Sequence, residues 1–216
     1  MDVFSVYGAL SMIVAYLCGS IPTAVWWGKA FHGLDVRAHG SRNAGATNTF
    51  RVLGAKAGVP VLLVDILKGF LPVRLLPLFV GTEAGGESEA LLRVLLALAA
   101  VLGHLYPVFA GFKGGKGVAT AYGTMLAMHP GAAALCTAVF AVVFLASRYV
   151  SLASLLSAVA FPLSLLLLFK VDGLVLPGFA LLLMAVVFYT HRQNIGRLLR
   201  GTENRMSFAG KNGDKS

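Results

Sequence analysis

Long apolar segments separated by short polar ones make up most of the chain. Seven of them are predicted to be transmembrane helices, at residues 3–28, 59–80, 91–110, 118–128, 131–147, 151–169 and 174–189. A helix needs about 20 residues to cross the hydrocarbon core of a bilayer, and most of these segments come close to that length. The fourth is short, and we expect it to tilt or to enter the membrane only partway. The pattern therefore predicts an all-α integral membrane protein with seven transmembrane helices.

Composition agrees with this class. Hydrophobic residues make up 57% of the chain and charged residues only 12%, with a mean hydropathy of +0.80, whereas soluble domains carry about 25% charged residues. We predict one transmembrane domain over residues 1–205 and a disordered cytoplasmic tail at 206–216. The first apolar segment has no basic stretch before it and no small-residue cleavage site, so we expect it to stay as a helix. Cys18 and Cys136 lie in apolar segments and are interpreted as packed thiols.

Positive charge is distributed unevenly between the polar segments. Most of the 18 Lys and Arg residues fall in segments that seven spans would place on the same side as the C-terminus. The positive-inside rule then puts the N-terminus outside and the C-terminus in the cytoplasm. Arg37, Arg42 and Lys56 are interpreted as surface charges attracted to lipid headgroups. Three polar segments would face the cytoplasm together: the first polar segment (40–51), the glycine loop (111–117) and the tail segment (191–203).

The glycine loop has the composition of a phosphate-binding turn. Its sequence is Gly111-Phe-Lys-Gly-Gly-Lys-Gly117, so it carries three candidate amide donors and two candidate cations: Gly114, Gly115, Gly117, Lys113 and Lys116. A predicted helix follows, and its N-terminal dipole would point into the loop. The loop is not a Walker motif, because Ala110 replaces the first glycine and Gly117 replaces the Ser or Thr. The alternative is a flexible basic turn between two helices.

The first polar segment is rich in side chains that bind phosphate or hydroxyl groups. Arginine binds phosphate with two parallel hydrogen bonds, and small amide and hydroxyl side chains complete such a site. An ordinary connecting loop is the alternative, but it would not need so many polar residues in so few positions. We therefore predict a ligand site that includes Ser41, Asn43, Thr47, Asn48 and Arg51.

Histidines and asparagine near the other polar segments supply further candidates. In the tail segment, His191, Asn194 and Arg197 are spaced to lie on a short amphipathic helix at the interface, with a lipid-facing basic helix as the alternative. His104 is interpreted as a hydrogen-bonding residue between helices, with a role in binding or catalysis as the alternative. Asp65 and Lys68 are expected to form an internal ion pair in the second span, or to support the site.

The sequence lacks the residue patterns that metal sites and several classes of catalytic site require. The chain has only nine carboxylates, and few lie near the polar segments: Asp35, Glu203 and Asp65. No cysteine or histidine cluster with metal-ligand spacing is present, nor is a Gly-x-Ser-x-Gly elbow or a His-x₄-Asp motif. We therefore predict no metal and no cofactor. Without an evident general base, the substrate itself is expected to supply one.

Four motifs together resemble one known family. They are Gly19-Ser-Ile-Pro22, the whole first polar segment, Gly103-His-Leu-Tyr-Pro-Val-Phe-Ala-Gly-Phe-Lys-Gly-Gly-Lys-Gly-Val-Ala-Thr120, and His191-Arg-Gln-Asn-Ile-Gly-Arg-Leu198. In this order and spacing they resemble the bacterial membrane glycerol-3-phosphate acyltransferases called PlsY. The resemblance implies a seven-helix membrane fold with a cytoplasmic active site. It also implies acylation of the 1-hydroxyl of sn-glycerol 3-phosphate by an acyl phosphate, giving lysophosphatidic acid and inorganic phosphate.

The resemblance also implies roles for individual residues. Ser41, Lys116, His191 and Asn194 fall on catalytic positions of the family, and Arg51 falls on a substrate-binding position. In the same motifs lie the other residues expected to bind substrate: Asn43, Thr47, Asn48, His104, Lys113, Gly114, Gly115, Gly117 and Arg197. The chain departs from the family at Thr190, where an arginine is usual, which leaves the role of Arg192 open. A phosphate oxygen of the donor is implied as the base.

The expected partners and the alternatives follow from this interpretation. The expected partners are glycerol 3-phosphate, acyl phosphate and membrane lipids, with no nucleic acid, and functional coupling is expected to the enzyme that makes acyl phosphate. The expected location is the bacterial inner membrane. The main alternative is an organophosphate transporter or flippase, which predicts a polar path to the outer face, and a second is a scaffold that binds anionic headgroups. The acyl-chain length and the oligomeric state are left open.

Overall fold

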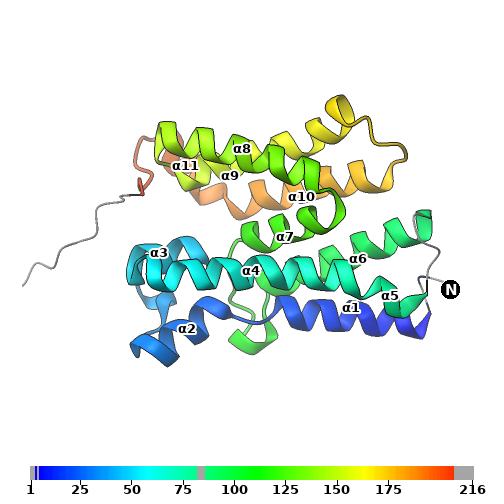
Figure 1. Ribbon diagram of the computed structural model, residues 1–216. Helices are drawn as coiled ribbons and strands as arrows, with labels where there is room; N and C mark the ends of the chain where they lie inside the picture. Colours follow the sequence, from blue (N-terminus) through cyan, green and yellow to red (C-terminus); the bar gives the residue numbers. More distant parts are fainter. Residues whose placement is uncertain (1–2, 4, 82–85, 207–216) are drawn as a thin grey trace, which may run out of the picture.

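Every regular element in the described part of the chain is a helix. The computed structural model describes residues 3, 5–81 and 86–206, and Figure 1 shows their arrangement in two layers with one short helix between them. All of the predicted tail except Met206 lies outside the described residues. The prediction of an all-α protein is confirmed for the described residues.

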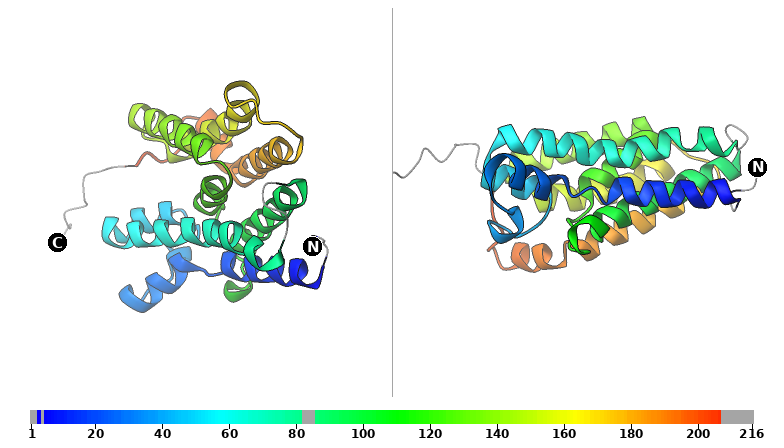
Figure 2. Two further views of the ribbon diagram at one scale, coloured as in Figure 1. Left: turned by 45° about the vertical axis from the view of Figure 1, so that its right-hand side comes forward. Right: turned by 90° about the horizontal axis from the view of Figure 1, so that it is seen from below.

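Three long helices form one layer and three form the other. The first layer contains α1 (Val6–Gly19), α4 (Ala55–Leu75) and α6 (Glu87–Leu105), and the second contains α8 (Pro130–Ser147), α9 (Val150–Leu163) and α10 (Val175–Thr190). Both Figure 1 and Figure 2 show α7 (Val118–Met128) between the layers, where it packs mainly against α4. The polar segments before and after these helices therefore meet at the ends of the layers.

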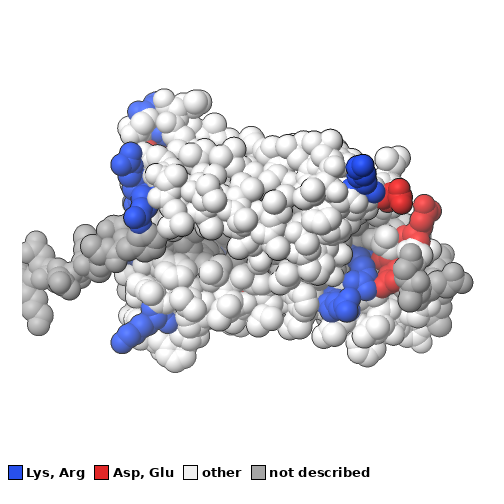
Figure 3. All heavy atoms as spheres, turned by 45° about the horizontal axis from the view of Figure 1, so that its top comes forward, with Lys and Arg blue, Asp and Glu red and all other residues white. Residues whose placement is uncertain are grey.

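Short helices gather at the two ends of the bundle. At one end, to the left in Figure 1, lie α2 (Thr23–His32), α3 (Ala46–Leu53) and α11 (Arg192–Leu199). At the other lies α5 (Pro77–Val80). On the face seen in Figure 3 the Lys and Arg residues gather at both ends, whereas the long middle shows no charged residue. Such a band of uncharged surface is what a bilayer requires of the protein it surrounds.

Two of the predicted segments change near their C-terminal ends, and one predicted loop is partly helical. In the segment 59–80, α4 ends at Leu75 and a second helix, α5, begins at Pro77. The segment 151–169 ends in a π-helical turn, Ser164–Leu168. In the first polar segment we expected a loop, but its second half forms α3, from Ala46 to Leu53. Burial of Asn48 and Thr49 against neighbouring elements outweighs their low helix propensity.

The polar break predicted at Gly19-Ser-Ile-Pro22 is confirmed, and an ion pair holds it. The helices α1 and α2 meet there at an angle of 40°, because Pro22 lacks the amide hydrogen that would continue the helix. Lys68 Nζ donates a hydrogen bond of 2.8 Å to the carbonyl oxygen of Ile21, which also accepts the backbone amide of Thr23 at 3.0 Å. It also lies 2.9 Å from Asp65 Oδ1, so the expected internal ion pair is confirmed.

Membrane-spanning length can be assigned to some of the helices by their own composition. Among the described residues, Glu87–Ala110, Pro130–Ser147 and Val150–Leu168 are each long and apolar enough to cross a bilayer. The pairs α1–α2 and α10–α11 meet the same test only together, and the second pair is bent by 63°. The helix α7 has 11 residues, as expected for the short fourth segment. The fold is therefore that of an integral membrane protein.

Candidate active site

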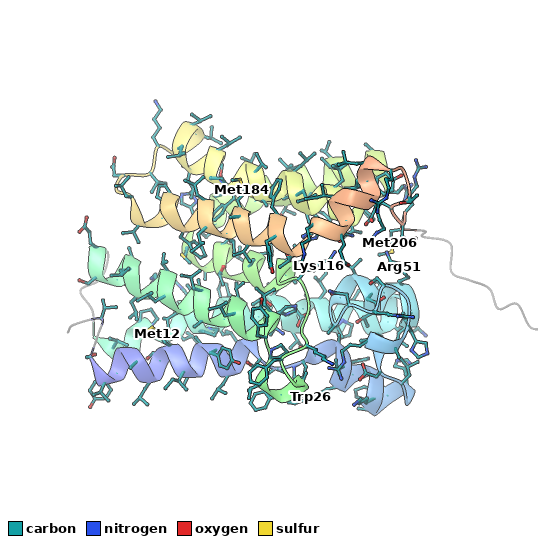
Figure 4. All side chains as sticks on the ribbon, turned by 180° about the vertical axis from the view of Figure 1, so that it is seen from behind. Met12, Trp26, Arg51, Lys116, Met184 and Met206 are labelled. Atoms are coloured by element: carbon teal, nitrogen blue, oxygen red, sulfur yellow. The ribbon has the colours of Figure 1, made fainter. Side chains whose placement is uncertain are left out.

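A cavity of about 900 Å³ opens at the end of the bundle where α3 and α11 lie. Figure 4 places Arg51 and Lys116 between the two layers at this end. All three polar segments line the cavity, as predicted. Of the predicted site residues, the lining includes Ser41, Asn43, Thr47, Asn48, Arg51, His104, Lys116, Gly117, His191, Asn194 and Arg197. It does not include Lys113, Gly114 or Gly115.

Asn48 shapes the first polar segment through contacts with the backbone. Its amide nitrogen donates to the carbonyl oxygens of Val36 at 2.8 Å and His39 at 3.1 Å. Its amide oxygen accepts a 2.8 Å hydrogen bond from the backbone nitrogen of Ser41. Because both ends of this buried amide are bonded to the protein, Asn48 fixes the position of Ser41. This differs from the direct substrate contact that we expected.

Arg37 joins the first polar segment to the glycine loop. Its guanidinium donates to the carbonyl oxygen of Ala110 at 3.0 Å and pairs with Asp35 at 2.7 Å. The hydrogen bond from Arg37 is the main reason that the pKa of Asp35 falls to about 2. The interpretation of Arg37 as a charge attracted to lipid was therefore wrong, because its hydrogen-bonding groups connect two segments of the site.

The glycine loop folds back onto the end of α6. The amides of Gly114 and Gly115 donate to the carbonyl oxygens of Leu105 and His104, each at 3.2 Å. A Cβ atom on Gly114 would lie 2.0 Å from the His104 oxygen, and one on Gly115 would lie 2.3 Å from His104 Nε2. Glycine is therefore required for close packing at both positions. The two amides are bonded to α6, which differs from the phosphate contacts that we expected of them.

The two lysines of this loop have different environments. Lys113 is exposed, whereas Lys116 is half-buried and reaches the cavity. Lys116 Nζ donates a hydrogen bond to Asn194 Oδ1 on α11. Thr190 donates a 3.4 Å hydrogen bond to the carbonyl oxygen of Lys116. The loop and α11 therefore position this one ammonium group at the cavity.

Glu203 organises the tail segment around the cavity. It accepts hydrogen bonds from Asn194 at 2.6 Å, from Arg197 at 2.7 Å and from Ser151 at 2.8 Å. Glu203 is one of the few carboxylates near the polar segments of the sequence, and no role was predicted for it. Its position as the single carboxylate in a basic segment was the available signal. Since Asn194 in turn holds Lys116, Glu203 acts on the site through other residues.

The electrostatics of the site favour an anionic ligand. Burial lowers the pKa of Lys116 to about 8, Glu203 raises it, and the positive charges of Arg197 and Arg51 lower it further. For Glu203, burial raises the pKa, but the hydrogen bonds from Asn194, Arg197 and Ser151 bring it below the usual value. One carboxylate thus stands among three cationic side chains. A bound phosphate would relieve the repulsion among the cations.

The histidines have distinct surroundings. His191 Nδ1 lies 2.8 Å from the carbonyl oxygen of Val187. A carbonyl only accepts, so Nδ1 carries the hydrogen and Nε2 is the acceptor in the neutral ring. His104 Nδ1 lies 3.1 Å from Thr120 Oγ1 on α7, which confirms the predicted hydrogen bond between helices. Arg192 stacks on Tyr189, 4.5 Å from the ring centroid, and donates to its carbonyl oxygen.

The deeper part of the cavity is mostly apolar. Below the cationic mouth it is lined by side chains such as Met125, Phe161, Leu183 and Val187. No group of three or more His, Cys, Asp or Glu side chains that could hold a metal ion occurs among the described residues. The arrangement suits a molecule with an anionic head and a long apolar chain.

Comparison with known proteins identifies the family. A family model described as "Glycerol-3-phosphate acyltransferase" matches residues 9–201. A protein of that name from Salinibacter ruber is 46% identical over 91% of this chain and 91% of its own length. Another from Fusobacterium nucleatum is 44% identical, over 91% and 97%.

A solved structure agrees in fold. The crystal structure of PlsY, described as an integral membrane glycerol 3-phosphate acyltransferase in its glycerol 3-phosphate form, superposes with a TM-score of 0.83. It is 41% identical and covers 92% of this chain and 95% of that one. The form with lysophosphatidic acid has a TM-score of 0.80. On these matches, the chain belongs to the glycerol-3-phosphate acyltransferase family and is an integral membrane enzyme of the PlsY type.

Proposed function

We propose that the protein transfers an acyl group from an acyl phosphate to the 1-hydroxyl of sn-glycerol 3-phosphate. The products are lysophosphatidic acid and inorganic phosphate, and the reaction is the first acylation of phospholipid biosynthesis. One observation carries the proposal: Lys116, Arg51 and Arg197 surround the mouth of a cavity whose deeper part is apolar. The related PlsY structures, in forms with glycerol 3-phosphate and lysophosphatidic acid, support it.

Cations and hydrogen-bonding groups at the mouth would bind the two phosphates. We assign Arg51, Arg197 and Lys116 to phosphate oxygens, with Asn194 orienting Lys116. Ser41, Asn43, Thr47 and His191 line the same space and would contact the polar parts of the substrates. As the leaving phosphate and the acyl oxygen gain negative charge, fixed donors stabilise them, and losing one such donor typically costs about 10²–10³ in rate.

The proton of the attacking hydroxyl requires an acceptor. Among the described carboxylates near the cavity, Glu203 is bonded to Asn194, Arg197 and Ser151, and Asp65 is paired with Lys68. We therefore propose that a phosphate oxygen of the donor takes the proton. The hydroxyl oxygen bonds to the acyl carbon, the bond from that carbon to the phosphate oxygen breaks, and the phosphate leaves with the proton. No metal or cofactor enters this scheme.

We also propose that the chain crosses the bacterial inner membrane seven times, with the active site in the cytoplasm. The seven spans would be α1–α2, α4–α5, α6, α7, α8, α9 and α10. Most Lys and Arg residues lie at the end of the bundle that holds the cavity, and the positive-inside rule places that end in the cytoplasm. Glycerol 3-phosphate would enter from water there, and the enzyme that produces acyl phosphate would supply the donor.

The test is phosphate release by purified protein in lipid, with palmitoyl phosphate and glycerol 3-phosphate and without coenzyme A. Lys116→Ala is compared with Lys113→Ala, which removes the exposed lysine of the same loop. We expect release that depends on glycerol 3-phosphate, that falls about 10²–10³-fold in Lys116→Ala and that is nearly unchanged in Lys113→Ala. Folded protein that binds glycerol 3-phosphate but releases no phosphate would contradict the proposal.

The transport alternative needs a route between the two ends of the bundle. A second cavity, of about 550 Å³, lies at the opposite end and is lined by Arg74, Glu89 and Arg93, but the two cavities share no lining residue. Between them α4 and α7 are in backbone contact, since a Cβ atom on Gly69 would lie 2.1 Å from the Thr120 oxygen. These contacts favour an enzyme over a transporter, and uptake of glycerol 3-phosphate into liposomes would overturn that choice.

A further inference from the structure

The apolar part of the cavity ends at a defined depth. On each of three helices the lining residues run inward from the mouth at intervals of three or four and then stop. The last of them are Met125 on α7, Phe161 on α9 and Leu183 on α10. One turn beyond Phe161, Leu165 is fully buried in the core and does not reach the cavity. Phe161 lines the cavity but is otherwise packed in the core, with 1% of its surface exposed, so it is the deepest lining residue on α9.

The wall above Phe161 contains hydroxyl groups, but they are already bonded. Ser154 donates to the carbonyl oxygen of Val150 at 2.8 Å and Ser157 to that of Cys136 at 3.0 Å. Thr137 donates to the carbonyl oxygen of Ala133 at 2.9 Å and lies 2.9 Å from the Tyr122 hydroxyl. Covering polar groups usually costs free energy because it leaves them without a hydrogen-bond partner. An alkyl chain against this wall would not do so, since these hydroxyls are bonded to the protein. The wall therefore accepts an alkyl chain despite its serines and threonines.

The depth of the cavity can be compared with the thickness of a leaflet. Met125 lies eight positions after Gly117, the residue before α7, and Leu183 lies eight positions before His191, the residue after α10. Eight helical steps rise by about 12 Å in each case. Half of the hydrocarbon core of a bilayer is about 15 Å. Figure 4 shows Met184, next to Leu183, much deeper in the bundle than Lys116 and Arg51. The cavity thus has the depth of the acyl chains in one leaflet.

We infer that Phe161 sets the upper limit of acyl-chain length for the reaction proposed above, on which this inference rests. An acyl phosphate held at Lys116 would extend its chain along α9 until the terminal methyl group meets the ring of Phe161. A longer chain has to bend or displace the ring, and so loses binding energy in the transition state. A shorter chain leaves part of the apolar wall uncovered.

Two substitutions should change the depth of the cavity along α9 in opposite directions. Phe161→Ala leaves a void that is continuous with the cavity, so extra methylene groups of a longer donor can fill it. Ala158→Leu lies one turn nearer the mouth on the same lining face, and its larger side chain makes the cavity shallower. Burying one more methylene group of the donor in the cavity should raise kcat/KM about fourfold. With Phe161→Ala, a donor two methylenes longer should therefore gain on the order of tenfold in relative kcat/KM.

The experiment measures kcat/KM for lauroyl, myristoyl, palmitoyl, stearoyl and arachidoyl phosphate with saturating glycerol 3-phosphate. We expect Phe161→Ala to shift the preference toward stearoyl and arachidoyl phosphate, and Ala158→Leu to shift it toward lauroyl and myristoyl phosphate. Leu165→Ala is the matched control, since it also removes buried side-chain volume, from the π-helical turn that continues α9, but outside the cavity. It should lower the melting temperature without changing the chain-length profile.

The outcomes separate this inference from the proposed function. If both cavity variants turn over substrate with the wild-type profile, or if Leu165→Ala shifts the profile as much, the inference is overturned and the acyltransferase assignment stands. If no acyl phosphate of any length reacts with glycerol 3-phosphate in folded wild-type protein, the proposed function itself fails. Should Phe161→Ala not fold, the shift toward shorter chains in Ala158→Leu decides the question.

Discussion

An inner and an outer cluster of charged side chains in the described bundle differ in how far their charges are compensated. In the inner cluster Asp65 and Lys68 are 1% and 6% exposed, and the single cation is matched by the single carboxylate at 2.9 Å. In the outer cluster Glu203 faces Arg197 at 2.7 Å, while Lys116 and Arg51 add further positive charge beside the cavity. The compensated pair holds the scaffold. The uncompensated cluster is ready to bind an anion.

Removing one partner of the inner pair should have the largest effect. Lys68→Met leaves the carboxylate of Asp65 buried without its partner and removes the lysine's hydrogen bond to the Ile21 carbonyl at the break between α1 and α2. Losing one member of a buried pair typically costs about 3–5 kcal/mol. We expect a large drop in the melting temperature of the purified protein.

The double variant Asp65→Leu with Lys68→Met tests the reason for that drop. Replacing both charges with apolar groups is often close to neutral, so the double variant should regain much of the lost stability. A double variant that melts as low as Lys68→Met would show that the hydrogen bond to Ile21, rather than the charge pairing, is what matters.

Neutralising the carboxylate of the outer cluster should have a smaller effect on the fold and a clear effect on catalysis. Glu203→Gln keeps the shape of the side chain but removes the charge that faces Arg197 and supports Asn194. Hydrogen bonds to charged groups contribute about 1.5–3 kcal/mol. We expect a moderately lower melting temperature and a lower kcat, both measured in detergent or lipid.

Ser151→Ala is the matched control for this change. It removes one neutral donor to Glu203 and leaves the carboxylate charged, so its effect should be about 1 kcal/mol. If Ser151→Ala lowers kcat as much as Glu203→Gln does, the charge of Glu203 has no special role in holding Lys116.

The pH profile should report the ammonium of Lys116. Its pKa is lowered from 10.5 to about 8, chiefly by burial, so the group is charged below that pH and neutral above it. Phosphate binding needs the charged form, and activity should therefore fall as the pH rises through about 8, by about tenfold for each further unit. In Lys116→Arg the guanidinium stays charged, so the fall in activity above a pH of about 8, the alkaline limb of the profile, should be absent whatever the residual rate. A limb unchanged in Lys116→Arg would assign it to another group.

The sequence was sufficient to find the segments of the site, because their composition differs from that of the spans around them. Lys116, Arg51, His191 and Asn194 were predicted to meet, and the structure brings them around one cavity. Charge asymmetry and helix length were enough to bring the three segments to one end of the bundle. That part of the prediction depends on counting residues along single helices.

What the sequence could not show are contacts between distant segments. The hydrogen bond from Arg37 to Ala110 joins residues 73 positions apart, and no local pattern marks it. The amides of Gly114 and Gly115 were expected to face phosphate, but the direction of an amide depends on what the loop packs against. Likewise, a buried asparagine such as Asn48 looks the same in a sequence whether it binds substrate or backbone.

The smallest predicted effect concerns Thr190, where the chain departs from its family's usual arginine. Its hydroxyl has one hydrogen, which it shares between the carbonyl oxygen of Val187 at 3.0 Å and that of Lys116 at 3.4 Å. Thr190→Val keeps the shape and removes this shared hydrogen bond, so we expect only about a twofold loss in kcat/KM for glycerol 3-phosphate, at the low end for neutral hydrogen bonds. A loss beyond tenfold would mean that Thr190 positions Lys116 as firmly as Asn194 does. In that case the position of Lys116 in the outer cluster would depend on a neutral contact as much as on charges. The degree of charge compensation would then no longer explain the difference between the outer cluster and the inner pair.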